Sequence, residues 1–300
     1  MRNQQKSIRK LSVPALILSL VIPGSLTISC LADIRPEALQ SRSTPADADR
    51  GRAIVLAGVE AQTGGNGDRR AYFRQGAIRV RLTDQWYGLA DALANEWPNS
   101  PQEIEFTFIP GKDAGVLKLL DATGNPTGQV WGIHDWNTWR QDNADSQPQY
   151  VHSDTIKFML PTMQYFLEMA YRLPDGGIFD YAGSSTIDGI DCHVVYITWD
   201  SYAGNSRSDQ YVAYYDQSTG RLYRVDFTVR DSMPFVTASA YYRDYRDVKG
   251  YMFPYRIDIS NLGDAEDLVH QYIIHSVETN VNFERADYAP DPDRAPASKH

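Results

Sequence analysis

The chain has 300 residues, 42% of them hydrophobic and 22% charged, so it can fold around a substantial core. Its formal net charge of −9 argues against sequence-independent binding to nucleic acid, which needs a basic surface. Two cysteines exclude a disulfide scaffold and a zinc site built from cysteines alone. The one strongly apolar run lies at the N-terminus, which excludes a polytopic membrane protein.

The first 29 residues have the order of an export signal. Four basic residues lie between positions 2 and 10, an apolar run covers residues 11–22, and small residues follow it. This run is shorter than the ~20 residues that a membrane-spanning helix needs. We therefore expect residues 1–29 to direct export and then to be removed, which leaves the exported chain more acidic.

Cys30 stands where a lipoprotein signal peptidase leaves its lipid-modified cysteine, directly after the small residue Ser29. Thr27 replaces the leucine that usually precedes this cysteine by three residues, so two other interpretations stay open: cleavage after Ala32, or an uncleaved anchor. Acyl chains on Cys30 would hold the protein on a bilayer. Because Leu31 and not aspartate follows, we expect a periplasmic protein anchored to the outer membrane.

The rest of the chain divides into a tether, one folded domain and a tail. Residues 30–50 should hold the lipid anchor and a linker, because they are rich in Ser, Pro, Ala, Asp and Arg. The folded domain is expected at 51–284. A helix capped near Thr44 and ended by Gly64 would join the two. Residues 285–300 contain several prolines and no periodicity, so a disordered tail is expected.

Most of the folded domain shows the alternation of apolar and polar residues that predicts β-strands, as at residues 222–229. Turn-rich segments at 121–128 and 216–220 separate such runs and predict hairpins. Strands joined by short turns indicate an antiparallel meander. The interior helix predicted for 155–171 has apolar residues at three- and four-residue spacings, and Pro161 is expected to split it. This helix should cover the apolar side of the sheet.

Four motifs in a fixed order resemble those of bacterial outer membrane lipoprotein-sorting proteins, relatives of the LolA and LolB lipoprotein carriers. The motifs are FMLPTMQYFLE at 158–168, IDGIDCHVV at 187–195, DQYVAYYDQSTG at 209–220 and YRDVKGYMFP at 245–254. Each motif alone is mainly turn chemistry, so their order and spacing carry the resemblance, over roughly residues 50–284. An inserted aromatic and Pro-containing stretch at 86–101 departs from the pattern.

The resemblance implies a mainly β fold: a strongly curved antiparallel sheet, or incomplete β-barrel, covered by helices. It also implies an apolar cavity between sheet and helices, which in the LolA and LolB carriers takes lipoprotein acyl chains. The run 192–199 agrees with such a sheet, because both of its faces carry apolar residues. A packed core would give the same pattern, so a filled interior is the alternative interpretation.

The candidate residues for lining the cavity come from the helix and from the strands facing it. They are Met159, Met163, Phe166, Leu167, Val195, Ile197, Val225, Phe227, Ile257 and Ile273. The methionines suit either interpretation, since their side chains fill irregular gaps and adapt to varied apolar ligands. The expected partner is the acyl chain of a lipid or lipoprotein, with an envelope protein as a further possible partner.

No motif points to catalysis, to a metal or to a cofactor. Nucleophile elbow, phosphate-binding loop and metal-ligand spacings are all missing from the sequence, and the histidines are scattered. Trp131, Trp136 and Trp139 would suit sugar stacking, or would pack a loop against the sheet. Cys192 is expected to be a buried thiol. We therefore predict a non-enzymatic envelope protein, with a structural or partner-binding lipoprotein as the alternative and an ester or sugar hydrolase as a weaker one.

Overall fold

The computed structural model describes residues 32–64, 68–204, 207–230 and 233–290, so the predicted export signal and Cys30 lie outside the described residues. The helices are α1 (Glu37–Gln40), α2 (Ala48–Gln62), α3 (Arg69–Arg74), α4 (Gly88–Ala94), α5 (Asp154–Arg172), the 3₁₀ helix η2 (Leu173–Asp175) and α6 (Arg285–Tyr288). The strands are β1 (Ala77–Trp86), β2 (Gln102–Phe108), β3 (Ala114–Leu120), β4 (Pro126–His134), β5 (Asn137–Gln141), β6 (Gln149–Tyr150), β7 (Ile178–Ile187), β8 (Ile190–Thr198), β9 (Tyr211–Asp216), β10 (Leu222–Val229), β11 (Met233–Val248), β12 (Tyr251–Asn261) and β13 (Leu268–Val281).

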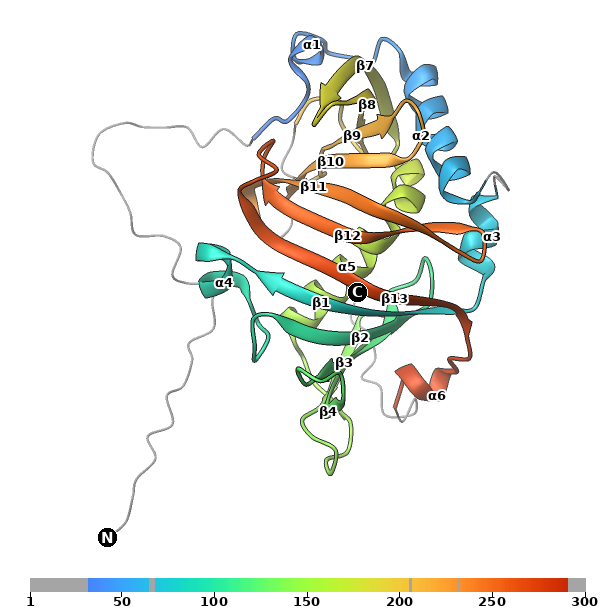
Figure 1. Ribbon diagram of the computed structural model, residues 1–300. Coiled ribbons are helices and arrows are strands. Elements are labelled where there is room, and N and C mark those ends of the chain that lie inside the picture. The colour runs from blue at the N-terminus through green and yellow to red at the C-terminus, as the bar shows by residue number, and fades with distance from the viewer. Residues whose placement is uncertain (1–31, 65–67, 205–206, 231–232, 291–300) are drawn as a thin grey trace, which may run out of the picture.

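All of these strands belong to one antiparallel sheet in the order β6-β5-β4-β3-β2-β1-β13-β12-β11-β10-β9-β8-β7. Because β1 pairs with β13, the first and last strands lie side by side within the sheet. The edges β6 and β7 do not pair with each other, so the sheet is open. The predicted antiparallel sheet is confirmed, without closure into a barrel, and Figure 1 shows α5 behind its central strands.

α5 is the helix predicted for 155–171. The Ser153 hydroxyl caps it by accepting a hydrogen bond from the Ile156 N–H at 3.2 Å. Pro161 lies inside the helix, which continues without a break to Arg172, so the predicted split is wrong. A proline removes one backbone hydrogen bond. Here the apolar face of the helix is buried from end to end, and this burial outweighs that loss.

α2 covers the same face of the sheet, beside β7, and confirms the helix expected before Gly64. Its residues Val55 and Val59 belong to the same core cluster as α5. Gly58 allows the close approach, because a Cβ atom there would lie 2.3 Å from the Tyr215 ring. Two helices therefore cover the sheet, one of them pressed directly against its strands.

The N-terminal segment, residues 32–47, lies on the opposite face of β8 and β9 and contains α1. Leu39 of α1 is fully buried against β8 side chains that include Tyr196. At the β7 edge, the Asp180 carboxylate accepts hydrogen bonds from two backbone N–H groups of the segment, at 3.2 and 2.9 Å. The tether predicted for 30–50 is therefore wrong for the described part of that range. The composition of this range is typical of a linker, but composition does not show that one leucine is buried or that backbone N–H groups are hydrogen-bonded to the sheet.

The N-terminal segment explains why β8 is apolar on both faces, as the sequence predicts. Val195 and Ile197 face α5 and the main core, whereas Val194 and Tyr196 face the N-terminal segment. Cys192 is fully buried as predicted, and burial raises the pKa of its thiol to about 11.

The C-terminal residues 285–290 are ordered, in contrast to the predicted disordered tail. They contain α6, and the carbonyl oxygen of Tyr288 accepts a hydrogen bond from the Trp139 indole at 2.8 Å. The prolines interrupt any long periodic pattern in this range, but they do not prevent a short helix from packing on the sheet. The contact between Trp139 and Tyr288 therefore could not be predicted from the sequence pattern. None of the helices within the described residues has the length and apolar character needed to cross a membrane.

Candidate hydrophobic binding site

The residues predicted to line a cavity gather, with one exception, in a single buried cluster between α5 and the sheet. The members are Met159, Met163, Phe166 and Leu167 of α5, Val195 and Ile197 of β8, Val225 and Phe227 of β10, and Ile257 of β12. Each is less than a tenth exposed. The Phe166 ring meets Phe227 edge-on at 5.4 Å between ring centroids, so helix and sheet are in direct contact.

Ile273 is the exception, and its inclusion is wrong. It is half-buried and pairs with Thr83 and Arg256 on the neighbouring strands. Its neighbours Tyr272 and Ile274 are the β13 side chains that enter the core. Successive side chains of a strand point to opposite faces, so a register error of one residue places Ile273 on the outer face.

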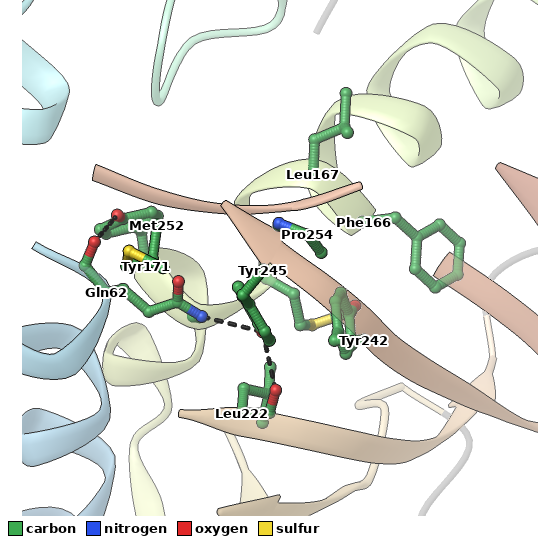
Figure 2. Close-up of a pocket in the computed structure, with 11 residues that line it drawn as sticks. Gln62, Phe166, Leu167, Tyr171, Leu222, Tyr242, Tyr245, Met252 and Pro254 are labelled. Carbon is green, nitrogen blue, oxygen red and sulfur yellow. Dashed lines mark hydrogen bonds between the residues drawn. The ribbon is translucent and has the colours of Figure 1, made fainter. Parts of the chain in front are cut away.

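The open space at this cluster is small. A cavity of about 10 Å³ lies between the C-terminal half of α5 and strands β10–β12, which is room for about one water molecule. Figure 2 shows its lining, which consists of Gln62, Phe166, Leu167, Met169, Ala170, Tyr171, Leu222, Tyr242, Tyr245, Met252 and Pro254. Phe166 and Leu167 are the two residues predicted from sequence. The sequence analysis missed the other lining residues, because the pattern of a strand does not show which end of the sheet a helix covers.

Polar side chains form part of the lining of this cavity. The Tyr245 hydroxyl donates a hydrogen bond to the Leu222 carbonyl oxygen at 2.7 Å and accepts one from the Gln62 amide at 3.0 Å (Figure 2). The Gln62 amide oxygen and the Tyr242 hydroxyl have no hydrogen-bond partner among the described residues, although both are buried. Figure 2 shows Gln62 and Tyr242 on opposite sides of Tyr245. Buried polar atoms normally have a partner, so these two positions suit water molecules or polar ligand groups.

α5 is attached to its surroundings by polar contacts in its C-terminal half. The Gln164 amide donates a hydrogen bond to the Ile109 carbonyl oxygen, and the Gly111 N–H donates to the Glu168 carboxylate, both at 3.0 Å. The Tyr171 hydroxyl donates to the Gln62 carbonyl oxygen at 3.1 Å. Glu168 is fully buried, and burial raises the pKa of its carboxyl despite the adjacent Arg172.

The N-terminal half of α5, residues 154–163, differs in this respect. Within the described part of the chain, no side-chain hydrogen bond joins these residues to the sheet, and the buried residues Ile156, Met159, Leu160 and Met163 make apolar contacts. Proline has no N–H to donate, so Pro161 weakens the backbone ladder between the two halves. The two halves of α5 are therefore held differently: polar contacts fix the C-terminal half, whereas among the described residues the N-terminal half is tied to β5 only at its cap, where the Ser153 N–H donates a hydrogen bond to the Thr138 hydroxyl at 3.3 Å.

The described residues contain no group of three or more His, Cys, Asp or Glu side chains that could hold a metal ion. The buried imidazole of His270 lies 2.6 Å from the Asp84 carboxylate, which also accepts from the Trp97 indole at 2.9 Å. This trio joins the inserted stretch at 86–101 to the sheet. His275 is exposed on the other face of β13, because positions five apart on a strand lie on opposite faces.

The three tryptophans do not form one platform. Trp139 is buried and Trp136 is 47% exposed, while Trp131 packs on Trp97 with 4.9 Å between ring centroids. Trp131 and Trp139 belong to strands β4 and β5 themselves, so only Trp136 presents a largely exposed ring.

When the chain is compared with known proteins, the feature that it shares with them is its fold. No family model matches the chain, and no curated protein matches its sequence. A solved structure of a DUF1329 family protein from Desulfovibrio piger matches with a TM-score of 0.50 and 12% identity, covering 82% of this chain and 99% of that one. At this identity the similarity concerns the fold alone.

Two further matches carry the names that the sequence motifs suggest. One is a LolA superfamily protein from Nitrosomonas europaea, with a TM-score of 0.48 and 14% identity over 82% of this chain and all of that one. The other, from Vibrio parahaemolyticus, is described as an outer membrane lipoprotein-sorting protein domain, with a TM-score of 0.49, 13% identity, and coverage of 82% and 99%. These two similarities likewise concern the fold alone.

Proposed function

We propose that the protein is a lipid-anchored component of the cell envelope that binds the acyl chain of a lipid or lipoprotein between α5 and the sheet. The proposal includes no catalysis. The observation that carries it is the contact between residues 154–163 of α5 and the sheet, which is made by apolar side chains without side-chain hydrogen bonds among the described residues. Separation of these surfaces would expose apolar side chains that an acyl chain can cover again.

Binding requires α5 to move, because the present cavity of about 10 Å³ holds no acyl chain. The helix would pivot near Pro161 while Gln164 and Glu168 keep its C-terminal half in place. Met159 and Met163 would line the opened space, since unbranched, polarisable side chains adapt to ligands of different shape. The buried polar atoms of Gln62 and Tyr242 would meet polar groups of the ligand.

The test is uptake of a fluorescent fatty acid by the purified exported chain, with native mass spectrometry after gentle extraction. We expect a bound lipid or saturable uptake displaced by oleate. Ala170→Leu fills the cavity and should weaken uptake, whereas Ala57→Leu makes the same change on the exposed face of α2 and should not. Absence of both adduct and uptake in the parent protein would refute the proposal.

A structural or partner-binding envelope protein is the second candidate, favoured by the small volume of the cavity. In that case Phe166→Asp unfolds the protein, and neither the parent protein nor the variant binds a lipid. A charge buried between α5 and Phe227 costs several kcal/mol in either case, so ligand uptake by the parent protein decides between the two candidates.

The proposed anchor is tested separately. The mass of the N-terminal peptide distinguishes lipidated Cys30 from cleavage after Ala32, and fractionation of the two membranes tests the outer membrane as the location. An unmodified peptide that begins at Asp33 would refute the anchor without affecting acyl-chain binding.

A further inference from the structure

α4 presents two leucines to solvent from within the inserted stretch at 86–101. Leu89 is 74% exposed and Leu93 45% exposed, and no residue of this helix is buried. Positions four apart lie on the same face of a helix, so the two side chains form one apolar strip. An ordered helix that leaves its leucines in water indicates a surface that meets an apolar partner.

The helix is fixed to the sheet at the end of β1. The Tyr87 N–H donates a hydrogen bond to the Val269 carbonyl oxygen at 3.1 Å, and the Tyr87 hydroxyl donates to the Gln271 side chain at 3.0 Å. The Asn95 amide closes the other end of α4 by donating to Asp91 at 2.8 Å. The sheet therefore holds the two leucines in a defined position.

Several chain segments meet at this end of the sheet, here called the α4 end. Trp86 at the end of β1 pairs with His270, near the start of β13, and Asn261 at the end of β12 pairs with Ala238, near the start of β11. Leu262 directly follows Asn261 and Val236 precedes Ala238 by two residues, and their side chains are 42% and 39% exposed. Four of the six exposed large hydrophobic residues of the described chain thus lie here, and Leu56 and Trp136 do not.

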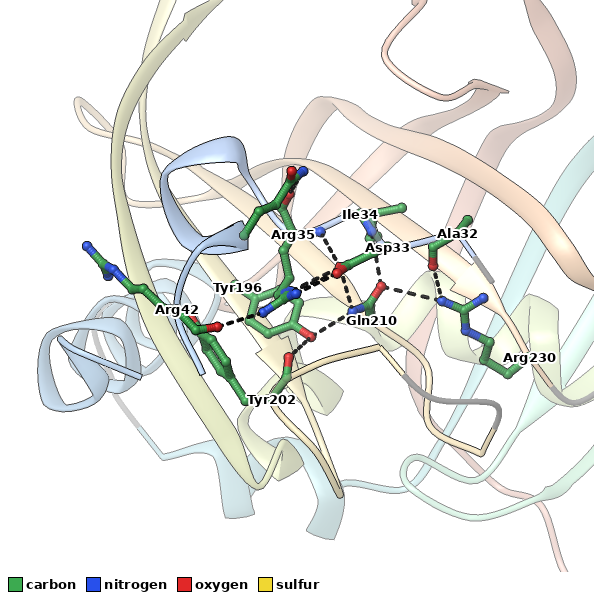
Figure 3. A network of polar contacts seen from close by, with 10 residues as sticks. Ala32, Asp33, Ile34, Arg35, Arg42, Tyr196, Tyr202, Gln210 and Arg230 are labelled. Carbon is green, nitrogen blue, oxygen red and sulfur yellow. Dashed lines mark hydrogen bonds and ion pairs between the residues drawn. The ribbon is translucent and has the colours of Figure 1, made fainter. Parts of the chain in front are cut away.

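The N-terminal segment begins beside β9 and β10, at the same end of the strands as α4 but separated from it by β11–β13, as Figure 1 shows. The carbonyl oxygen of Ala32 accepts a hydrogen bond from Arg230, which directly follows β10. Figure 3 shows how the next residues are held: the Gln210 amide donates to Asp33 at 3.0 Å, and its oxygen accepts from the Ile34 N–H at 3.0 Å. The start of the described chain is therefore tied to the sheet.

The anchor is consequently short. Cys30 precedes Ala32 by two residues, and two residues span at most about 7 Å. Acyl chains on Cys30 would enter a bilayer within about 7 Å of Ala32, at the same end of the strands as α4. The β12–β13 turn beside it carries Asp264, Glu266 and Asp267, which disfavours an anionic surface.

We propose that the α4 end of the sheet rests on a zwitterionic bilayer, with Leu89 and Leu93 at the boundary between headgroups and acyl chains. This inference rests on the proposed anchor at Cys30. The exported chain would then stand on the membrane in one orientation. The hairpin turns β7–β8 and β9–β10 lie at the other ends of their strands and point away from the membrane.

The test attaches the exported chain through Cys30 to a maleimide lipid in phosphatidylcholine vesicles. Cys192 does not compete, because it is fully buried. Leu89→Trp and Leu93→Trp place an indole on the proposed contact, and Leu56→Trp is the matched control, 45% exposed on α2. We expect emission from both α4 variants to shift to the blue and to be quenched severalfold more by brominated lipid than emission from the control.

Equal quenching in the α4 variants and the control would overturn the proposal. A blue shift that grows with protein concentration in the absence of vesicles would assign α4 to a contact with a second copy, and would overturn it as well. Because the coupling supplies the tether chemically, a failure here is distinct from a failure of lipidation at Cys30, which the mass of the N-terminal peptide reports.

Discussion

Replacing Phe166 by alanine tests whether α5 and the sheet form one packed core. Phe166 is 7% exposed, lines the cavity and meets the rings of Phe227 and Tyr272 at centroid distances of 5.4 and 6.2 Å. Loss of the buried ring costs about 1.5–3 kcal/mol in transfer free energy. Each lost aromatic pair adds about 0.5–1.5 kcal/mol, so the free energy of unfolding should fall by about 3–5 kcal/mol.

Urea denaturation followed by circular dichroism measures this change, with Leu56→Ala as the control, since an exposed leucine should cost no more than about 0.5 kcal/mol. The cavity left by Phe166→Ala adjoins the one already present, so a small apolar molecule such as benzene should restore part of the stability. A loss below about 1 kcal/mol would show that α5 is not packed on the sheet, and would refute the reasoning behind the site.

Three further results are expected. Leu39→Ala should lower the free energy of unfolding by about 2–4 kcal/mol and expose the N-terminal segment to limited proteolysis; unchanged proteolysis would contradict its docking on β8. Burial raises the folded-state pKa of Glu168 above its unfolded value. Folding therefore takes up a proton at pH values between the two pKa values, and the free energy of unfolding should rise as pH falls from the folded-state pKa to the unfolded one. Glu168→Gln should remove that part of the pH dependence of urea unfolding, and an unchanged profile would contradict the assignment. The Cys192 thiol should react with a disulfide reagent at pH 8 only after unfolding, because it is buried and burial raises its pKa to about 11; rapid reaction of the native protein would count against this.

The amino-acid sequence by itself determined the elements whose patterns are local. The apolar spacing of 155–171 specifies an amphipathic helix, and the alternation at 222–229 specifies a strand with Val225 and Phe227 on its core face. The two apolar faces of β8 predicted that something must cover each of them. These features follow from helix and strand periodicity, which a single segment displays on its own.

Tertiary structure decided the features that depend on partners distant in sequence. Ile273 and Tyr272 are both apolar or aromatic, and pairing of β13 with β1 and β12 decides which of them enters the core. Docking of Leu39 turned a linker-like composition into an ordered segment, since one buried leucine and hydrogen-bonded backbone outweigh the composition of the rest. The volume left between α5 and the sheet likewise depends on how side chains from α2, α5 and β10–β12 fill the same space, and no single segment contains that information.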